Sequence, residues 1–507
     1  MVLPDDDAAL AAVFALCLFV RAAVGLSGYS GESAPPMYGD FEAQRHWMEV
    51  TVNLPPAAWY MDGLDNDLQY WGLDYPPLSA HLSWLLGHAA RRLGHPELVA
   101  LHASRGLETP ATRAYMRNTV LASDALVFFP AVAAVVRASA PRGSRLAFAL
   151  QLLAVPALVL VDHGHFQYNC VSLGLALWAA HAAMAGRPLA CCAAFSLALN
   201  FKQMSLYLAP AFFCYLLAGC LGAATARGRV AAVARLGAAV LLTFAACWAP
   251  LLRPASTAPE AALAVLRRVF PVERHLYEDK VANIWCTLAL LPPLKLKALL
   301  PIGALLRVAL GSTALALAPP CALLLARPSR LGFLLCATGC CLAFFLCSYQ
   351  VHEKHILLPL LPASLLAPRQ PALFGWLSAA ATFSLFPLLK RDGLALPYAC
   401  CQAAALALAL GPLPSPAQWA LPRAARAAMC LSLCGMLVLH LLEASLAPPA
   451  RYPDLHSVAF AAYSCAHFVA AYLGALLWQW RARDTEPRHT PFEPGTDYEL
   501  APRAKRA

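Results

Sequence analysis

The sequence predicts an all-α, polytopic membrane protein, and three observations support this fold class. Of the 507 residues, 60% are hydrophobic and only 13% are charged, with a mean hydropathy of +0.58. Soluble domains carry about 25% charged residues, so this chain has too little polar surface to face water throughout. Apolar runs of about the length that spans a bilayer recur along it. Several loops between these runs carry arginines without acidic residues, which is typical of cytosolic loops.

The apolar runs predict about fourteen transmembrane helices, although several runs are short. The first run follows the acidic segment MVLPDDD, which lacks the basic start of a cleaved signal peptide, so we expect it to be a retained span. The region 252–302 is ambiguous and could cross the membrane, re-enter it or lie on its surface. The runs lie near residues 8–27, 115–137, 146–162, 168–185, 188–201, 204–221, 230–250, 303–325, 331–349, 356–367, 371–388, 396–410, 427–446 and 456–480.

The placement of arginines predicts the topology. The loop at 137–145 holds three arginines and no acidic residue, and so does the loop at 222–235, whereas the segment 28–115 holds ten acidic and five basic residues. The arginine-rich loops are therefore expected in the cytosol and the acidic segment on the opposite, lumenal side. With fourteen spans, both termini are cytosolic. Three further polar segments then share the lumenal side: 162–169, 252–285 and 350–355.

The chain is predicted to form a single membrane domain with four consecutive parts. They are a first lumenal loop at 28–115, a motif-bearing transmembrane module at 116–362, C-terminal transmembrane helices at 363–480 and a cytosolic tail at 481–507. The net charge of +10 reflects the basic loops and gives no indication of nucleic-acid binding. Many of the 18 cysteines lie inside apolar runs, where they behave as small hydrophobic residues, and no CxxC pair has metal-binding spacing.

The first polar motif, YGDFEAQRHW at 38–47, follows the first span. It brings Asp40, Glu42, Arg45 and His46 close to the membrane. A carboxylate in a partly dry setting there can act as a general base. The structural alternative is a solvated loop with an ordinary helix start after Asp40.

The second and third motifs add two further groups of polar residues. In LQYWGLDYPPL at 68–78, Asp74 and Tyr75 precede two prolines, and the aromatic residues suit either a sugar face or the membrane interface. In VDHGHFQYN at 161–169, Asp162, His163 and His165 lie near a membrane surface. One Asp and two His in a loop are weak support for a metal site, so hydrogen bonding to a polar ligand is the favoured interpretation.

Two later motifs are rich in charge. The segment VFPVERHLYEDKVANIW at 269–285 contains Lys280 and can also be explained as an amphipathic segment on the membrane surface. In YQVHEKHILLPLLP at 349–362, His352, Lys354 and His355 stand where one span ends and the next begins. Charged residues at such a position indicate a functional site, and these suit a phosphate at the bilayer surface. Snorkelling of the lysine is the structural alternative.

Taken together, these motifs and ALNFKQMSLYLAP at 198–210 resemble the dolichyl-phosphate-glucose-dependent glucosyltransferases of the N-glycan pathway. The resemblance runs in matching order from Tyr38 to Pro362, and the C-terminal third is similar only in its apolar spans. It implies the GT-C architecture, a polytopic helical domain with a long first lumenal loop in the endoplasmic reticulum. Two sister groups share the pattern, adding the first or the second glucose. EAQRHW and LQYWGLDYPP are closer to the group that adds the first glucose, in alpha-1,3 linkage, to a Man9GlcNAc2 lipid-linked oligosaccharide.

The resemblance also implies a mechanism without metal or other cofactor. The beta-linked donor, dolichyl-phosphate-glucose, and the alpha-linked product require inversion, with one base for the acceptor hydroxyl and cationic groups for the leaving phosphate. By the match, Asp40 is the base and Asp74 is an orienting carboxylate. The donor phosphate would meet His352, Lys354 and His355. Further candidates for substrate contact are Glu42, Arg45, His46, Tyr75, His163, His165, Lys202 and Lys280.

Two other function classes are alternatives to an enzyme. A lipid or sugar transporter would place charges within broken helices at the midplane, whereas here the polar motifs gather on one face. A non-catalytic subunit of a glycosylation complex would not need Asp40 and Asp74 in intact motifs. Both classes are therefore less favoured than an enzyme.

Overall fold

The computed structural model describes residues 6–270, 280–288, 301–410, 421–493, 498 and 500. These residues form helices and connecting turns, and the β-structure among them is a single isolated bridge between Gly63 and Asn66. Within the described ranges, eight helical segments are long and apolar enough to cross a membrane, or nine when one bent pair counts as a span. The predicted all-α, polytopic fold class is confirmed.

Each of the fourteen apolar runs contains helix, but not every run is a full span. The run at 356–367 forms only the eight-residue α17, and the run at 371–388 divides into α18 and α19. The count of fourteen is therefore not confirmed. The membrane-length segments are α1 (Asp6–Val24), α4 (Pro110–Ser123) continued by η3 (Asp124–Phe128) and α5 (Phe129–Ser139), η6 (Gln203–Leu208) with α10 (Ala209–Leu221), α11 (Ala226–Trp248), α15 (Ile302–Ala326), α16 (Arg330–Cys347), α21 (Arg423–Ser445) and α22 (Leu455–Ala482). The shorter ones are α6 (Arg145–Leu153), α7 (Pro156–Val159) with η5 (Leu160–Phe166), α8 (Asn169–Met184), α9 (Pro188–Phe201), α17 (Leu357–Ser364), α18 (Pro371–Ser384), α19 (Phe386–Arg391) and α20 (Ala395–Leu410).

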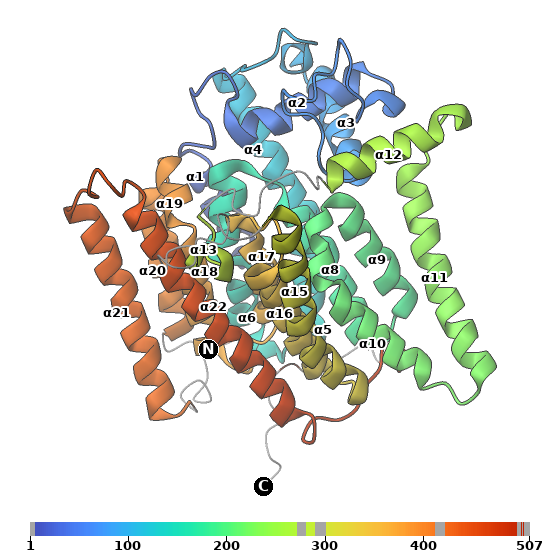
Figure 1. Ribbon diagram of the computed structural model, residues 1–507, viewed down its shortest axis with the longest axis vertical. Helices are drawn as coiled ribbons and strands as arrows, with labels where there is room; N and C mark the ends of the chain where they lie inside the picture. Colours follow the sequence, from blue (N-terminus) through green and yellow to red (C-terminus); the bar gives the residue numbers. More distant parts are fainter. Residues whose placement is uncertain are drawn as a thin grey trace.

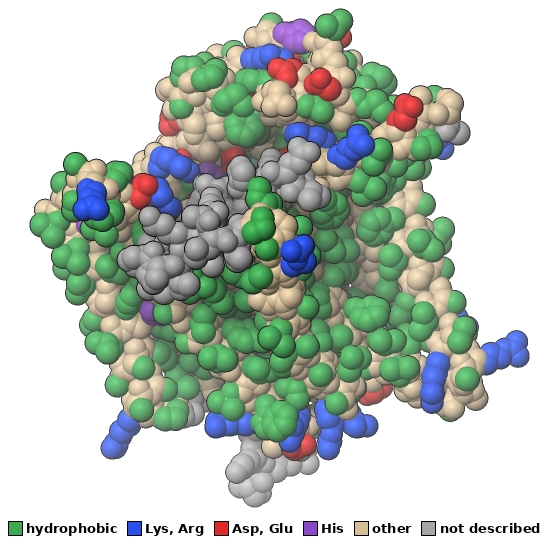
Figure 2. All heavy atoms as spheres, viewed as in Figure 1, with side chains coloured by type: hydrophobic (Ala, Val, Ile, Leu, Met, Phe, Trp, Pro, Cys, Tyr) green, Lys and Arg blue, Asp and Glu red, His purple; other side chains and the backbone are tan. Residues whose placement is uncertain are grey.

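The helices form a bundle with a cap at one end (Figure 1). The cap contains α2 (Gly39–Asn53) and α3 (Pro77–Arg92), and α12 (Ala258–Val269) lies beside it. A small core of aromatic and aliphatic side chains, including Trp47, Trp59 and Val265, joins these helices. The acidic segment 28–115 is thus a folded cap rather than an open loop. Lysine and arginine side chains gather at the opposite end of the bundle (Figure 2), as the arginine pattern predicts.

The central helices are buried on nearly all sides, whereas the outermost ones face the surroundings. Of the 16 residues of α8, 13 are buried, and its Gly174 lies so close to η3 that a Cβ would be 3.0 Å from the Cα of Phe128. In contrast, only 6% of the apolar window of α11 and of α21 is buried, which suits contact with lipid.

Parts of two predicted segments lie outside the described residues. They are residues 271–279 of the 269–285 motif and residues 501–507 of the predicted cytosolic tail. None of the eighteen cysteines forms a disulfide. Three of them, Cys321, Cys336 and Cys340, bring their sulfur atoms within 4.8 Å of one another between α15 and α16. A search for CxxC spacing misses this group, because it combines helical i, i+4 spacing with a residue from a neighbouring helix.

Candidate active site

Asp40 stands on the first turn of α2, where two consecutive left-handed residues turn the chain. Tyr38 has φ 55° and Gly39 has φ 62°. A Cβ on Gly39 would lie 2.5 Å from the carbonyl carbon of Ser30, so only glycine fits this close approach. The backbone N–H of Asp40 donates to Ser30 Oγ at 3.2 Å. The tight turn therefore fixes Asp40 at a helix N-terminus, where a negative charge is favoured.

The carboxylate of Asp40 is the meeting point of three separate motifs. Its Oδ2 lies 2.9 Å from His165 Nε2 and accepts a hydrogen bond from Gln167 Nε2 at 2.7 Å. It also accepts from the ammonium group of Lys354. The side chain is 21% exposed, so solvent or a substrate can reach it. Burial alone would raise the pKa of Asp40, but Lys354 and His165 outweigh it and hold this pKa well below its usual range. Asp40 is therefore ionised.

Backbone strain accompanies this convergence. Phe166, between His165 and Gln167, has φ 89°, and its reversal at the end of η5 lets both neighbours reach the same carboxylate. Gln350, in the fifth motif and two residues before His352, has φ 58°. Non-glycine residues in this region cost about 1–3 kcal/mol each and cluster at functional sites. The segments around Asp40 show this clustering.

The fifth motif supplies positive charge next to Asp40. Lys354 Nζ lies 3.2 Å from His165 Nε2, and the lysine side chain is only 15% exposed. In η8 (Glu353–Ile356), His355 Nδ1 accepts from the backbone N–H of His352 at 3.1 Å. Burial, together with the charges of His352, Lys202 and Lys354, lowers the pKa of His355 well below its ordinary value. His352, Lys202 and Lys354 thus bring positive or protonatable groups to this segment, which suits an anionic ligand.

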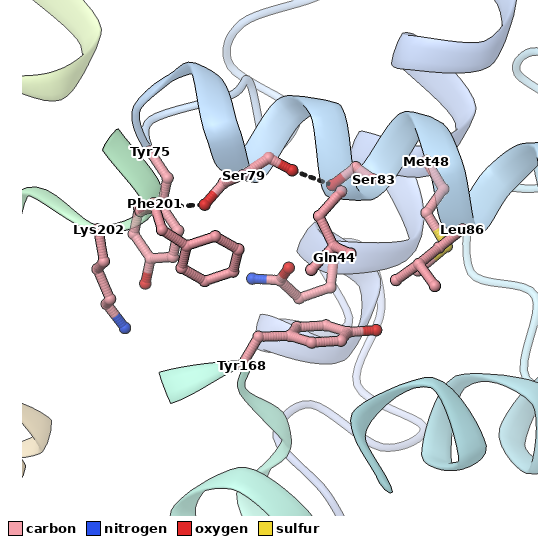
Figure 3. Close-up of a pocket in the computed structure, with 10 residues that line it drawn as sticks. Gln44, Met48, Tyr75, Ser79, Ser83, Leu86, Tyr168, Phe201 and Lys202 are labelled. Carbon is pink, nitrogen blue, oxygen red and sulfur yellow. Dashed lines mark hydrogen bonds between the residues drawn. The ribbon is translucent and has the colours of Figure 1, made fainter. Parts of the chain in front are cut away.

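A small pocket next to this cluster connects the second motif with Lys202 (Figure 3). Lys202 Nζ lies 4.7 Å from the ring centre of Tyr75 and donates to Asn169 Oδ1 at 2.6 Å. The Tyr75 hydroxyl donates to Gln167 Oε1 at 3.4 Å, which links the pocket to Asp40. Gln44 and Tyr168 project into the same space (Figure 3). The pocket has a free volume of about 10 Å³, which is enough for one water molecule.

Asp74 lies half-buried at the edge of this region. Its backbone carbonyl accepts a hydrogen bond from Gln203 Nε2 at 3.2 Å. Burial and the charge of Asp74 raise the pKa of Tyr60 in the cap. Asp74 therefore acts electrostatically on the cap core as well as facing the Lys202 side of the site.

Glu42, Arg45 and His46 lie on the opposite face of α2 from Asp40, because helical residues three or four apart share a face. Arg45 donates to both carboxylate oxygens of Glu42, at 2.7 and 2.6 Å, and to Glu49 at 2.7 Å. His46 Nδ1 lies 3.2 Å from the same Glu49 carboxylate. All four side chains are at most 1% exposed. Their sequence-based assignment to substrate contact is therefore replaced by a structural role inside the cap.

Replacing Arg45 with alanine is expected to destabilise the cap strongly. It leaves Glu42 and Glu49 as buried carboxylates without their cation, and breaking a buried pair from one side costs about 3–5 kcal/mol. The measurement is the thermal unfolding midpoint of the purified protein. The matched control is Arg92→Ala, an exposed arginine of the same cap, with an expected change within about 0.5 kcal/mol. Equal midpoints for both variants would contradict the structural role.

The polar residues at 162–165 turn toward different partners. Asp162 accepts from Asn169 Nδ2 at 2.7 Å, and His163 Nε2 lies 3.0 Å from Asp124, which also binds Arg21. Only His165 reaches Asp40. The three residues thus do not form a common ligand set, and hydrogen bonding of this motif to a polar ligand stays a prediction.

Three placements complete the comparison with the predicted site. Lys280 forms an ion pair with Asp454 at the surface, and both side chains are about half exposed, so Lys280 does not join the Asp40 cluster. Gln167 belongs to a motif that the sequence singled out, but its role as a donor to Asp40 was missed. Asp392, which approaches His165 at 2.5 Å, was missed completely. Its only sequence signal is an acidic residue beside Lys390 and Arg391 between two apolar runs.

Known proteins are similar in sequence to most of this chain. The ALG6, ALG8 glycosyltransferase family matches residues 17–474. The chain is 42% identical over 478 residues to the dolichyl pyrophosphate Man9GlcNAc2 alpha-1,3-glucosyltransferase of Gallus gallus, covering 90% of this chain and 93% of that protein. It is 40% identical over 479 residues to the probable enzyme of the same name from Drosophila melanogaster, covering 94% and 98%. The probable Arabidopsis thaliana enzyme is 46% identical over 387 residues, 75% of this chain and 71% of that protein.

The family match spans both the cap with Asp40 and the segments that bring His165 and Lys354 to it. The chain belongs to the ALG6, ALG8 glycosyltransferase family.

Proposed function

We propose that this protein transfers glucose from dolichyl-phosphate-glucose to Man9GlcNAc2-PP-dolichol, forming the first alpha-1,3-linked glucose of the N-glycan precursor. The observation that carries the proposal is the ionised Asp40 carboxylate, partly exposed and in direct contact with the ammonium group of Lys354. A single inverting displacement requires a base for the acceptor hydroxyl and a cation for the leaving phosphate, on opposite sides of the anomeric carbon. Asp40 and Lys354 supply these two groups once the substrates separate them. The names of the relatives from Gallus gallus and Drosophila melanogaster specify the same acceptor and linkage.

In this reaction Asp40 accepts the proton of the attacking acceptor hydroxyl. The bond between the glucose anomeric carbon and the phosphate oxygen breaks as the new carbon–oxygen bond forms from the opposite side. Lys354 stabilises the leaving dolichyl phosphate, and His352 and His355 lie on the same short segment. The apolar helices around the site keep the dolichyl chains in the bilayer while the sugars meet at its surface.

Lys354 has two roles in this mechanism. Without substrate it pairs with Asp40, and this pairing lowers the basicity of the carboxylate. When a donor phosphate draws the ammonium group away, the pKa of Asp40 rises, because an opposite charge stabilises the ionised form less at greater distance. Donor binding therefore strengthens the base in the same step that positions the leaving group.

The decisive test is transfer by the purified, reconstituted protein with defined lipid-linked acceptors. We expect glucose to move from dolichyl-phosphate-glucose to the Man9 acceptor, and not from a nucleotide sugar. Preference for Glc1Man9 would move the protein to the sister activity that adds the second glucose. No transfer to either acceptor, with folded protein and intact donor, would overturn the proposed function.

We further propose that the protein resides in the endoplasmic reticulum membrane with the cap in the lumen and both termini in the cytosol. A glycosylation acceptor inserted at Gly63, an exposed cap position where added atoms meet nothing within 4 Å, is expected to be modified. One inserted at Gly143, an equally open position in the arginine-rich loop, is expected to stay unmodified. Gel mobility before and after glycan removal measures both, and the reverse pattern would place the site in the cytosol.

A further inference from the structure

A buried contact joins His165 of the third motif to Asp392, which lies outside all the predicted motifs. Asp392 follows α19 and is 227 residues away from His165 in the sequence. Its Oδ2 lies 2.5 Å from His165 Nδ1, while the other ring nitrogen of His165 lies 2.9 Å from Asp40. The two side chains of this distant pair are 4% and 3% exposed. The ring is thus held between two carboxylates.

We propose that Asp392 is a positioning residue of the glycosyl-transfer reaction, which acts by orienting and charging His165 against the carboxylate of Asp40. This inference rests on the proposed function of Asp40 as the base. A carboxylate ion only accepts hydrogen bonds, so His165 donates from Nδ1 to Asp392, and the Asp40 carboxylate at Nε2 favours a second proton on the ring. Burial and Lys354, whose Nζ lies 3.2 Å from the same Nε2, lower the pKa of His165, but Asp392 and Asp40 outweigh them and raise it. Asp392 fixes both the rotation of the ring and its protonated form.

The turn that carries Asp392 packs closely against neighbouring backbone. A Cβ on Gly28 would lie 2.4 Å from the carbonyl oxygen of Asp392, so the turn packs directly on the backbone that leads into the cap. Arg117 ties the same region together by donating to the carbonyl oxygens of His163 and Gly164 and of Ser27 and Gly28. The backbone N–H of Ser30 donates to the His165 carbonyl at 3.0 Å. Asp392 therefore holds His165 from a rigid support.

The charges around His165 explain why an acid is needed there. Asp40 and Asp392 are negative, Lys354 and the doubly donating His165 are positive, and these four balance one another. Other titratable groups also act on this region. Arg117 from α4 interacts with Asp392, Lys202 at the end of α9 interacts with Asp40, Lys354, Asp162 and Asp74, and His355 interacts with Lys354. Without the charge of Asp392 the cluster carries an excess of positive charge, and His165 is the member that can release a proton.

This argument predicts the behaviour of Asp392→Asn. The neutral amide no longer holds His165 charged, so Asp40 loses one of the cations that keep its pKa low. The base is active only when deprotonated. The acidic limb of the kcat/KM profile therefore moves to higher pH. Outer partners that orient metal-binding histidines contribute about 10- to 100-fold. We expect a loss of similar size in kcat, with little change in the KM for the donor.

The experiment compares Asp392→Asn, Asp392→Glu and the wild type in reconstituted transfer with dolichyl-phosphate-glucose across pH. Asp392→Glu keeps the charge and is expected to restore the position of the acidic limb. The control is Asp65→Asn, whose exposed carboxylate lies 3.1 Å from His102 on the cap, with expected wild-type kinetics. An Asp392→Asn enzyme with an unshifted profile, whether fast or slow, would reduce Asp392 to a purely structural residue and overturn the inference.

A second measurement separates the inference from the proposed function. If Asp392 acts through His165, the two substitutions are not additive. Asp392→Asn then lowers the thermal unfolding midpoint of the wild type but lowers it little further when His165→Gln is already present. Additive losses would overturn the inference, and this readout needs no substrate. A wild-type protein that transfers no glucose, yet shows the coupling, would instead reject the proposed function while keeping the Asp392–His165 link.

Discussion

Asp40→Asn is expected to abolish glucose transfer almost completely in a protein that still folds and still binds the donor. Asparagine preserves the shape of the side chain and can accept the hydrogen bond from Gln167, but it cannot take a proton from the acceptor hydroxyl. Loss of a general base typically costs about 100- to 10,000-fold in rate. The measurement is single-turnover transfer with saturating dolichyl-phosphate-glucose, alongside donor binding to the same preparation.

Asp74→Asn provides the comparison for this experiment. Asp74 lies on the Lys202 side of the site, and an orienting carboxylate tolerates an amide better than a base does, so its loss is expected to be milder. A near-normal Asp40→Asn enzyme together with an inactive Asp74→Asn enzyme would transfer the role of base to Asp74.

Lys354→Met is expected to cause the second-largest loss, and the loss should fall on use of the donor. Removing one preorganised contact to developing charge costs about 100- to 1000-fold. The substitution also takes away the cation that lowers the pKa of Asp40, so the carboxylate protonates at higher pH and the acidic limb of the rate profile moves upward. Donor and acceptor kinetics measured separately across pH check both effects.

The control for Lys354 is Lys390→Met. Lys390 lies on α19, is half exposed and pairs with Glu443 at the surface, so wild-type kinetics are expected. His352→Ala is expected to weaken donor use less than Lys354→Met, since the His352 side chain is 39% exposed and therefore more strongly solvated. Unchanged donor kinetics in Lys354→Met would exclude the fifth motif from the phosphate site.

Much of the fold could be predicted from the hydrophobicity of the sequence. The features that could not be predicted have physical explanations. Every apolar run contains helix, because backbone groups in a bilayer must satisfy their hydrogen bonds within the segment. The length of each helix did not follow, since α17 and α18 are enclosed by other helices and need not cross the bilayer alone. The folded cap within segment 28–115 could not be predicted from hydrophobicity, because its aromatic core, around Trp47 and Trp59, depends on contacts distant in sequence.

The candidate site was predicted in part. Asp40, His165 and Lys354 all stood in motifs that the sequence singled out, and the structure brings them together. The misassignment of Arg45 could have been avoided, because positions 42, 45, 46 and 49 repeat at helical spacing and define one face. Asp40 and Gln44, four residues apart, define another face of the helix. Gln44 on this face lines the pocket beside Lys202. Asp392 could not have been found, because nothing local marks which isolated acid reaches across the bundle.

The long sequence separations within the site have a consequence for biosynthesis. Asp40 emerges from the ribosome early, yet its partner Lys354 is made 314 residues later, and Asp392 follows that. While the later helices are still being inserted, the early half holds ionisable groups at the membrane without their counter-charges. We expect an unfinished chain, whose site is only partly neutralised, to be less stable than the complete fold. Substitutions in the C-terminal helices that delay insertion should then lower the amount of protein even where they touch no substrate.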